Sequence, residues 1–194
     1  MSKAQKTEIP IAAFPGQKAF EAWLSKNHSS THAVWIRFFK KDSGVKTITH
    51  AEALDVALRY GWIDSQAKTY DAASYLQKFT PRGPKSIWSK INTQHIERLI
   101  REQKMQPAGM AQVEAAKKDG RWQSAYSSPK NMEIPADFLK ELKKSRAASE
   151  FFKSLNKANV YAIAWRLQTA KKPETRRKRM EAILEMIASR KSFH

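Results

Sequence analysis

The sequence predicts an α+β protein, with a small, mostly antiparallel sheet and flanking helices followed by an all-helical C-terminal unit. Segments with strand character lie between residues 33 and 80, whereas helical periodicity dominates after residue 89. The 41% hydrophobic and 10% aromatic content of the 194 residues favours a packed core. Ser127–Pro135 holds two prolines and is the expected linker. We therefore expect an α+β domain over 1–127 and a helical segment over 128–194 packed on it, although the two parts could also form one continuous domain.

The first elements are an amphipathic helix and a strand. Residues 17–26 form the helix, with Phe20, Trp23 and Leu24 on one face. Residues 33–41 alternate as a strand does, with Val34, Ile36 and Phe38 on one face and Trp35, Arg37 and Phe39 on the other. Because both faces carry apolar groups, we expect this strand to be covered on both sides.

A second helix should follow over residues 50–60. Thr49 is its expected N-cap, with Glu52 completing a capping box, and Gly61 ends it. Two further short strands are expected at 62–63 and 74–80. The loop between them should carry three charged residues, Asp64, Lys68 and Asp71.

The remaining elements should all be helices. Their expected ranges are 89–103, 109–118, 136–144, 149–169 and 173–190. The last has the strongest pattern, because Pro173 suits the first helical position and Met180, Ile183, Leu184 and Ile187 form one apolar stripe.

The chain is strongly cationic. It has 36 Lys and Arg against 18 Asp and Glu, a net charge of +18, and a pI near 10.1. The last 67 residues carry half of this excess, so they are about twice as densely charged as the rest. Such a charge attracts anionic partners, among them nucleic acid. There are no cysteines, and no apolar run approaches the roughly 18 residues of a membrane span. The expected compartment is the cytoplasm, and no cofactor is expected.

Familiar catalytic and metal-binding motifs are missing from the sequence. None of the five histidines lies in an HExxH arrangement, and there is no P-loop, G-x-S-x-G or G-x-G-x-x-G. His95 falls on an apolar helical stripe, which is more typical of a core histidine than of a base. Asp64 and Asp71 could act as a catalytic carboxylate pair on a small anionic substrate, or could be turn and capping carboxylates. No catalytic residue is assigned.

The best candidate binding site combines aromatic and cationic residues between positions 61 and 92. Guanidinium and ammonium groups there could hold an anion while an indole stacks on its ring. The predicted ligand-binding residues are Trp62, Asp64, Lys68, Arg82, Ser86 and Trp88. Asp64 would orient Arg82 or Lys68. The alternative interpretation is that both tryptophans are core rings and that Arg82 pairs with Asp64.

A second cationic candidate is the run from Lys171 to Arg179. On a helix its charges spread around the axis. Arg176 lies near the packed stripe, so we expect it to pair with an internal carboxylate. Arg177 and Lys178 should point outward, where they either contact an anion or nucleic acid or simply form a solvated helix start.

Several blocks along the chain resemble the YdeI/OmpD-associated (bacteriocin-protection) family. They include Gly61-Trp62-Ile63-Asp64-Ser65, Phe79-Thr80-Pro81-Arg82 and, near the end, Ala170-Lys171-Lys172-Pro173-Glu174-Thr175-Arg176. The resemblance extends from about Phe20 to Ala188. It implies a bacterial cytoplasmic protein connected with tolerance of bacteriocins or antimicrobial peptides, and it brings no list of catalytic residues. Trp165-Arg166-Leu167 departs from the family pattern and could alter the contact between the terminal helices.

These observations favour a non-enzymatic binding protein that recognises an anionic ligand or partner. Direct capture of a cationic peptide by a protein of charge +18 would meet like-charge repulsion. Any protective role is therefore expected to be indirect. Nucleic-acid binding through the basic C-terminal helices and an enzyme using Asp64 or Asp71 are the alternatives. The sequence predicts no oligomeric state.

Overall fold

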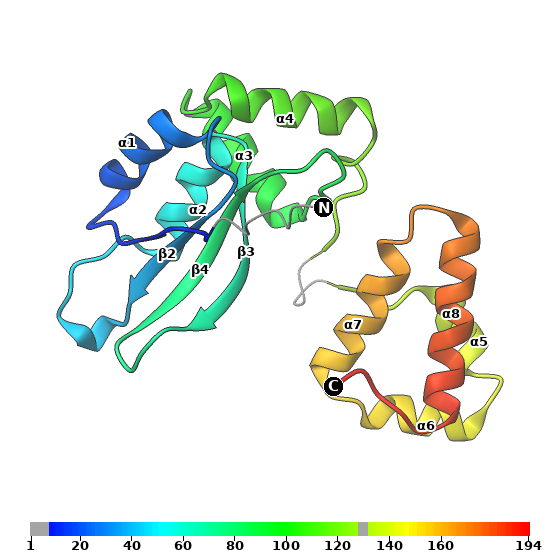
Figure 1. Cartoon of the computed structure of the whole chain (residues 1–194). Helices are drawn as coiled ribbons and strands as arrows, with labels where there is room; N and C mark the ends of the chain where they lie inside the picture. The colour runs from blue at the N-terminus through cyan, green and yellow to red at the C-terminus, as the bar shows by residue number, and fades with distance from the viewer. Residues whose placement is uncertain (1–7, 128–131) are drawn as a thin grey trace, which may run out of the picture. The chain divides into compact units, whose positions relative to one another are not determined.

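The computed structural model describes residues 8–127 and 132–194 (Figure 1). The chain forms two compact units. The N-terminal unit comprises Met1–Ser86 and Asn92–Gln123, and the C-terminal unit comprises Ile87–Ile91 and Ser124–His194. The architecture is α+β, as predicted. Packing of the helical segment on the first unit stays a prediction.

A four-stranded mixed sheet organises the N-terminal unit. Its strands are β1 (Ile11–Ala12), β2 (Val34–Phe39), β3 (Trp62–Thr69) and β4 (Ser74–Pro81). They lie in the order β1-β2-β4-β3, with β1 parallel to β2 and the other two pairs antiparallel. The helices of this unit are α1 (Gln17–Asn27), α2 (His50–Arg59), α3 (Lys90–Arg101) and α4 (Pro107–Lys118), with a short turn η1 (Lys41–Ser43).

One face of this sheet builds an aromatic core with α1 and α2. Val34, Ile36 and Phe38 are buried there with Phe20 and Phe79. The residues between them in β2 are only half-buried, so the expectation that this strand is covered on both sides is not met. Figure 1 shows α2 behind the sheet, and no described helix of this unit lies over the face nearer the viewer.

Local signals at the ends of α2 act as predicted. The Thr49 hydroxyl accepts a hydrogen bond from the Glu52 amide, and the Glu52 carboxylate accepts one from the Thr49 amide, which lowers the pKa of Glu52. Gly61 follows the helix with φ of 74°, a conformation that favours glycine. Gly109 allows α4 to approach α2 closely, since a Cβ there would lie 2.2 Å from the Arg59 carbonyl oxygen.

Strand β3 is longer than the predicted 62–63. Its pairing with β4 shifts between Asp64 and Ala67, which marks a bulge. Beyond the bulge the ladder continues to Thr69. Asp64 and Lys68 therefore lie on a strand rather than in the predicted loop, and Asp71 alone lies in the connecting turn. A regular pattern could not indicate this, because a bulge breaks the period-2 alternation.

The C-terminal unit contains four helices in its described part, α5 (Ala136–Leu142), α6 (Arg146–Ser154), α7 (Lys157–Gln168) and α8 (Pro173–Ala188). The prediction of a single helix over 149–169 is wrong, because the helix is interrupted at Leu155 and Asn156, between α6 and α7. The Asn156 side chain caps α7 by accepting a hydrogen bond from the Asn159 amide. Pro173 occupies the start of α8, as predicted.

The core of this unit is aliphatic and aromatic, and it includes Phe138, Ile163, Leu167, Ile183 and Ile187. The short segment 87–91 joins the unit through hydrogen bonds with Tyr126, whose amide donates to the Trp88 carbonyl. Among the described helices of the chain, none has the length and apolar character needed to cross a membrane.

Candidate functional site

The two tryptophans of the predicted site are core residues. Trp62 and Trp88 are each 1% exposed. The Trp62 indole donates a hydrogen bond to the His28 carbonyl, 3.2 Å away, and meets the Trp23 ring edge-on. The two belong to different compact units. Their burial favours the interpretation of both as core rings, since a buried indole face cannot stack on a ligand.

The polar members of the predicted site have local contacts. Asp64 Oδ2 lies 3.0 Å from His50 Nε2, and Lys68 Nζ lies 4.5 Å above the Trp35 ring. Arg82 is 6% exposed, and the Ser86 hydroxyl accepts a hydrogen bond from the Gly83 amide. The six residues as one ligand-binding set stay a prediction.

Asp71 is a turn carboxylate. It accepts hydrogen bonds from the Ser74 hydroxyl at 2.7 Å and the Ala73 amide at 2.9 Å, and it pairs with Arg37 at 2.6 Å. These contacts, the Ser74 hydroxyl first, lower the pKa of Asp71. A carboxyl group with a lowered pKa is poorly matched to proton transfer near neutral pH. The structural interpretation of Asp71 is therefore favoured over the catalytic one.

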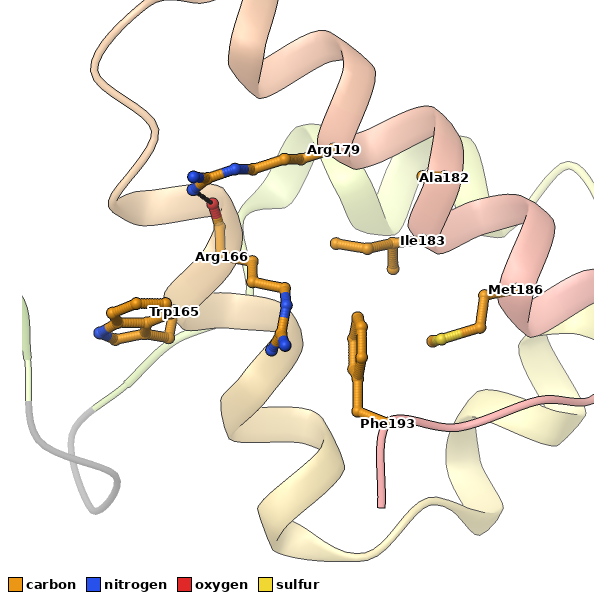
Figure 2. A pocket seen from close by; sticks show the side chains of 7 residues that line it. All are labelled: Trp165, Arg166, Arg179, Ala182, Ile183, Met186 and Phe193. Atoms are coloured by element: carbon orange, nitrogen blue, oxygen red, sulfur yellow. Dashed lines mark hydrogen bonds between the residues drawn. The ribbon is translucent and has the colours of Figure 1, made fainter. Parts of the chain in front are cut away.

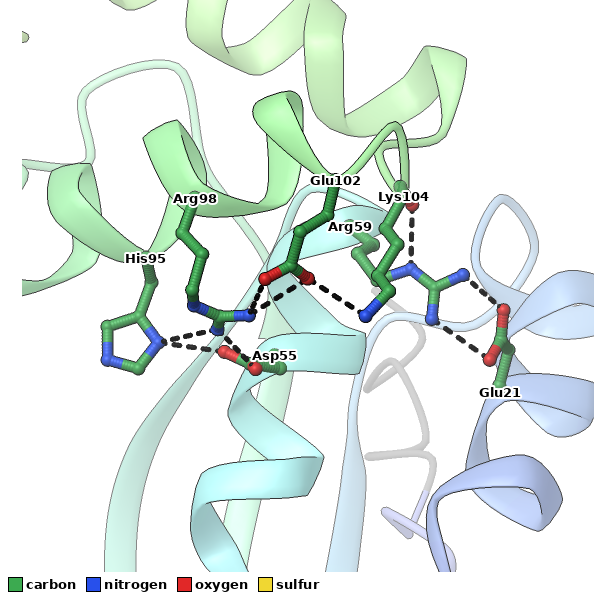
Figure 3. Close-up of polar contacts among 7 residues, drawn as sticks. All are labelled: Glu21, Asp55, Arg59, His95, Arg98, Glu102 and Lys104. Atoms are coloured by element: carbon green, nitrogen blue, oxygen red, sulfur yellow. Dashed lines mark hydrogen bonds and ion pairs between the residues drawn. The ribbon is translucent and has the colours of Figure 1, made fainter.

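A network of paired charges joins the helices of the N-terminal unit (Figure 3). Arg59 of α2 forms a bidentate pair with Glu21 of α1 and donates to the Lys104 carbonyl at 2.7 Å. Arg98 of α3 pairs with Asp55 of α2, whose other oxygen lies 2.7 Å from His95 Nδ1. His95 thus has a carboxylate partner and is partly exposed, rather than a core residue.

The same network gives each of these cations a carboxylate partner. Asp55 raises the pKa of Arg98 through its hydrogen bond, and Lys104 and Arg98 lower the pKa of Glu102. Each guanidinium group here is bonded to a carboxylate of the same unit. We interpret the cluster as a set of ion pairs that holds α1, α2 and α3 together. No group of three or more His, Asp or Glu residues suited to a metal ion occurs in the described part of the chain.

A pocket of about 310 Å³ lies in the C-terminal unit (Figure 2). It forms between α7, α8 and the segment that follows α8. Its lining residues are Trp165, Arg166, Arg179, Ala182, Ile183, Met186 and Phe193. Five of these seven side chains are apolar or aromatic, and the other two are arginines. The pocket thus combines a hydrophobic wall with two positive charges, as small-molecule sites commonly do.

The two arginines of the pocket are held by backbone oxygens and a ring. Arg179 donates to the Arg166 carbonyl at 2.8 Å, reaching from α8 across to α7. The Arg166 guanidinium carbon lies 3.8 Å from the centre of the Phe193 ring, and the group donates to the Ala162 carbonyl at 3.3 Å. Within the described residues neither forms an ion pair with a carboxylate. Both therefore line the pocket without a carboxylate partner among the described residues.

Phe193 is held in place by Asn159. The buried Asn159 amide oxygen accepts hydrogen bonds from the backbone amides of Phe193 and His194, at 2.8 and 3.1 Å. Its nitrogen donates to the His194 carbonyl. A single side chain thus fixes the segment that supplies the aromatic wall. The wall in turn fixes Arg166, so the cation is positioned before any ligand arrives.

Sequence patterns did not reveal this pocket. Its residues come from two helices and a terminal segment, and they meet only through the packing of α7 against α8. The one available signal was the unusual Trp165-Arg166-Leu167, which holds two of the lining residues. Whether that departure from the family pattern alters the contact between the terminal helices stays a prediction.

The other basic residues of α8 behave as expected in part. Arg176 forms a bidentate pair with Asp137, at 2.5 and 2.8 Å, which confirms its predicted internal partner. This pair lowers the pKa of Asp137. Arg177 lies 3.9 Å from Glu181, and both side chains are about two-thirds exposed. Lys178 is exposed as well. Anion or nucleic-acid contacts by Arg177 and Lys178 stay a prediction.

Comparison with known proteins divides the chain into two matches. Residues 12–112, just over half of the chain, match the family described as Domain of unknown function (DUF8412). The chain belongs to this family. Residues 131–190 match the family Bacteriocin-protection, YdeI or OmpD-Associated. No curated protein and no solved structure gives a significant match.

These matches refine the resemblance inferred from sequence. It is confirmed over residues 131–190 only. The blocks around Gly61 and Phe79 fall in the DUF8412 part instead. All lining residues of the pocket except Phe193 lie within the YdeI/OmpD-associated match. The pocket therefore belongs to the segment that carries the bacteriocin-protection description.

Proposed function

We propose that this DUF8412 protein is a non-enzymatic binding protein for an anion that carries an apolar group. The ligand would occupy the pocket of the C-terminal unit. One observation carries the proposal: Arg166 and Arg179 adjoin an apolar cavity of about 310 Å³, and neither forms an ion pair within the described residues. A fatty or aromatic carboxylate, sulfonate or phosphate has both properties that the cavity complements.

The physical basis is the cost of leaving a partly buried cation without a counter-ion. A guanidinium group beside apolar walls loses hydration, and a planar anionic group restores the lost hydrogen bonds in a bidentate manner. Phe193 holds the Arg166 group at 3.8 Å, so little side-chain entropy is lost on binding. The apolar part of the ligand would contact Ile183 and Met186, which line the same cavity.

The proposed ligand could also connect this protein with bacteriocin protection. The description of the matching family names such a role. Because the protein carries a net charge of +18, like-charge repulsion disfavours direct capture of a cationic peptide. We therefore propose that protection acts through an anionic ligand or partner. Tight binding of a cationic bacteriocin to the purified protein at low salt would contradict this part.

The binding test uses 8-anilinonaphthalene-1-sulfonate, a fluorescent aromatic anion. Arg166→Gln and Arg179→Gln should each weaken its binding by roughly tenfold, because each removes a charge-assisted contact. The matched control is Arg146→Gln, on α6 of the same unit, where the side chain is 94% exposed and paired with Glu150. The control should bind the probe as the unaltered protein does.

Competition separates the pocket from general hydrophobic adsorption. Decanoate should displace the probe, whereas decyltrimethylammonium, with the same chain and the opposite charge, should not. Ala182→Trp should fill the pocket and abolish probe binding without removing a charge. Equal displacement by both competitors, or full binding by the Ala182→Trp protein, would overturn the proposed site.

A cellular test addresses the protective role. A bacteriocin-sensitive strain would express the unaltered protein, the Arg166→Gln/Arg179→Gln double variant or the Arg146→Gln control at matched levels. Increased survival with the first and third, but not with the double variant, is the expected result. Equal survival with all three proteins would show that the two pocket arginines are not needed for protection.

A further inference from the structure

The half-exposed face of the sheet in the N-terminal unit presents rings and cations together. Antiparallel register places Trp35 opposite Lys78 and Phe39 opposite Ser74, on the face that does not contact α2. On the opposite face, Val34, Ile36, Phe38 and Phe79 belong to the core, and Tyr75 packs against it. The side chains Trp35, Phe39 and Lys78 are each neither buried nor fully exposed. Solvent therefore reaches part of each of these three side chains, whereas Leu76 and Ser74 on the same face are buried beneath them.

The bulge in β3 brings a further cation onto this face. Asp64, before the bulge, lies on the α2 side, where it contacts His50. With regular alternation Lys68 would point to that same side. The shift between Asp64 and Ala67 instead pairs Lys68 with Leu76 on the half-exposed face, where its Nζ lies 4.5 Å above the Trp35 ring.

A second group of rings surrounds Arg37 of β2. The Arg37 guanidinium lies 4.4 Å from the Phe39 ring centre and 4.8 Å from that of Tyr70, which is 49% exposed. Asp71 and Ser74 anchor this guanidinium, at 2.6 and 2.9 Å. Arg37 is thus partly neutralised and serves to position the two rings. Lys68 and Lys78 form no ion pair within the described residues.

We infer that this face, built from Trp35, Phe39, Tyr70, Lys68 and Lys78, binds single-stranded nucleic acid. Every base has a π-face that an exposed aromatic ring can stack on, and nearby ammonium groups neutralise the phosphates. Exposed rings on a four-stranded sheet are an established way of stacking unpaired bases. A duplex hides its base faces, so this surface should discriminate against it. Charge complementarity with a protein of +18 supports the same occupant.

This inference is independent of the pocket, since every residue it uses lies in the N-terminal unit. It also differs from the hypothesis of binding through the basic C-terminal helices. There, exposed cations such as Arg177 and Lys178 lack neighbouring aromatic residues on α8. Phosphate contacts alone would bind duplex and single strand without a preference based on stacking.

The test measures fluorescence anisotropy of labelled 12-mer oligothymidylate and oligouridylate with the full-length protein. Binding should be at least tenfold tighter than to a 12-base-pair duplex. Lys68→Gln/Lys78→Gln should lower single-strand affinity at least fivefold and reduce the salt slope by about 0.7 for each charge removed. The control, Lys18→Gln/Lys118→Gln, removes two exposed lysines from α1 and α4 of the same unit and should change affinity less than twofold.

Ring variants test stacking separately from charge. Phe39→Leu retains an apolar side chain but removes the π-face, and it should weaken single-strand binding roughly fivefold or more. Circular dichroism verifies that each variant is folded. The inference is overturned if no single strand binds, if duplex binds equally well, if the lysine control loses as much affinity as Lys68→Gln/Lys78→Gln, or if Arg177→Gln/Lys178→Gln carries the loss.

Discussion

The arginines of the C-terminal pocket have different partners from the arginines that form ion pairs in the N-terminal unit. In the N-terminal unit Arg37, Arg59, Arg98 and Arg121 each contact a carboxylate. In the C-terminal pocket Arg166 and Arg179 rest on backbone carbonyls and a ring. Net charge alone hides this distinction. Anion recognition depends on which cations lack an internal counter-ion and on which of those adjoin a surface that can hold the rest of a ligand.

The largest effect should come from disturbing the helix contact beside the paired arginines. Gly109→Ala places a methyl group 2.2 Å from the Arg59 carbonyl oxygen, so α4 must move away from α2. We expect the free energy of unfolding to fall by about 3 kcal/mol. Urea titration followed by circular dichroism measures it. Gly83→Ala, where the new Cβ meets only ordinary contacts, should stay within about 0.5 kcal/mol.

Removing a carboxylate from the network tests whether its arginines need their partners. Glu21→Gln leaves the Arg59 side chain, 10% exposed, without an opposite charge. Because Glu21 itself is about one-third exposed, we expect a loss of about 2 kcal/mol rather than the full effect of a buried pair. Glu150→Gln removes the partner of the exposed Arg146 and should cost less than about 0.5 kcal/mol. Equal losses of unfolding free energy in Glu21→Gln and Glu150→Gln would contradict the expected difference between buried and exposed ion pairs.

In the C-terminal unit the matching test targets Asn159. Asn159→Ala removes the acceptor of the Phe193 and His194 amides, so the unfolding free energy should fall by about 1–2 kcal/mol. Loss of the aromatic wall should also weaken binding of the anionic probe to Arg166. Lys157→Ala, at an exposed position of the same helix, serves as the control for both measurements. A stable variant with full probe binding would show that the wall does not position the cation.

The smallest effect concerns the ion pair between Arg176 and Asp137 in the C-terminal unit. Arg176 lowers the pKa of Asp137 below its ordinary value of 3.8, so this pair stabilises the fold above that pH. The contribution disappears as pH falls through the lowered pKa of the folded state. Asp137 is about half exposed, so the pair should contribute no more than about 1 kcal/mol. The measurement is the difference in unfolding free energy between the unaltered protein and Asp137→Asn at pH 6 and at pH 2.5. A difference that is larger at pH 2.5 would contradict the prediction.

Local features of the fold could be predicted because their causes are local. The capping box of Thr49 and Glu52 needs only residues three apart, and Pro173 starts a helix through its own ring geometry. The alternation of Val34, Ile36 and Phe38 likewise reflects one strand. The break at Leu155 was missed because helical periodicity continues across it, while Asn156 caps the next helix.

The candidate sites could not be predicted in the same way. Arg166 and Phe193 meet only because Asn159 holds the chain after α8 against α7. Lys68 reaches Trp35 only because of a bulge. Conversely, the conspicuous Trp62 and Trp88 are packed inside. Residue type indicates what a side chain can bind, whereas exposure depends on tertiary contacts far apart in the sequence.

The placement of residues 87–91 has a practical consequence for dissecting the molecule. This segment lies inside the DUF8412 match, yet it pairs with Tyr126 in the C-terminal unit. The two units are thus interleaved along the chain rather than consecutive. A fragment that begins at residue 124 would contain the entire bacteriocin-protection match but would lack Trp88, an indole that is 1% exposed. A fragment that ends at residue 123 would contain the whole N-terminal unit, but its segment 87–91 would lack the hydrogen bonds with Tyr126.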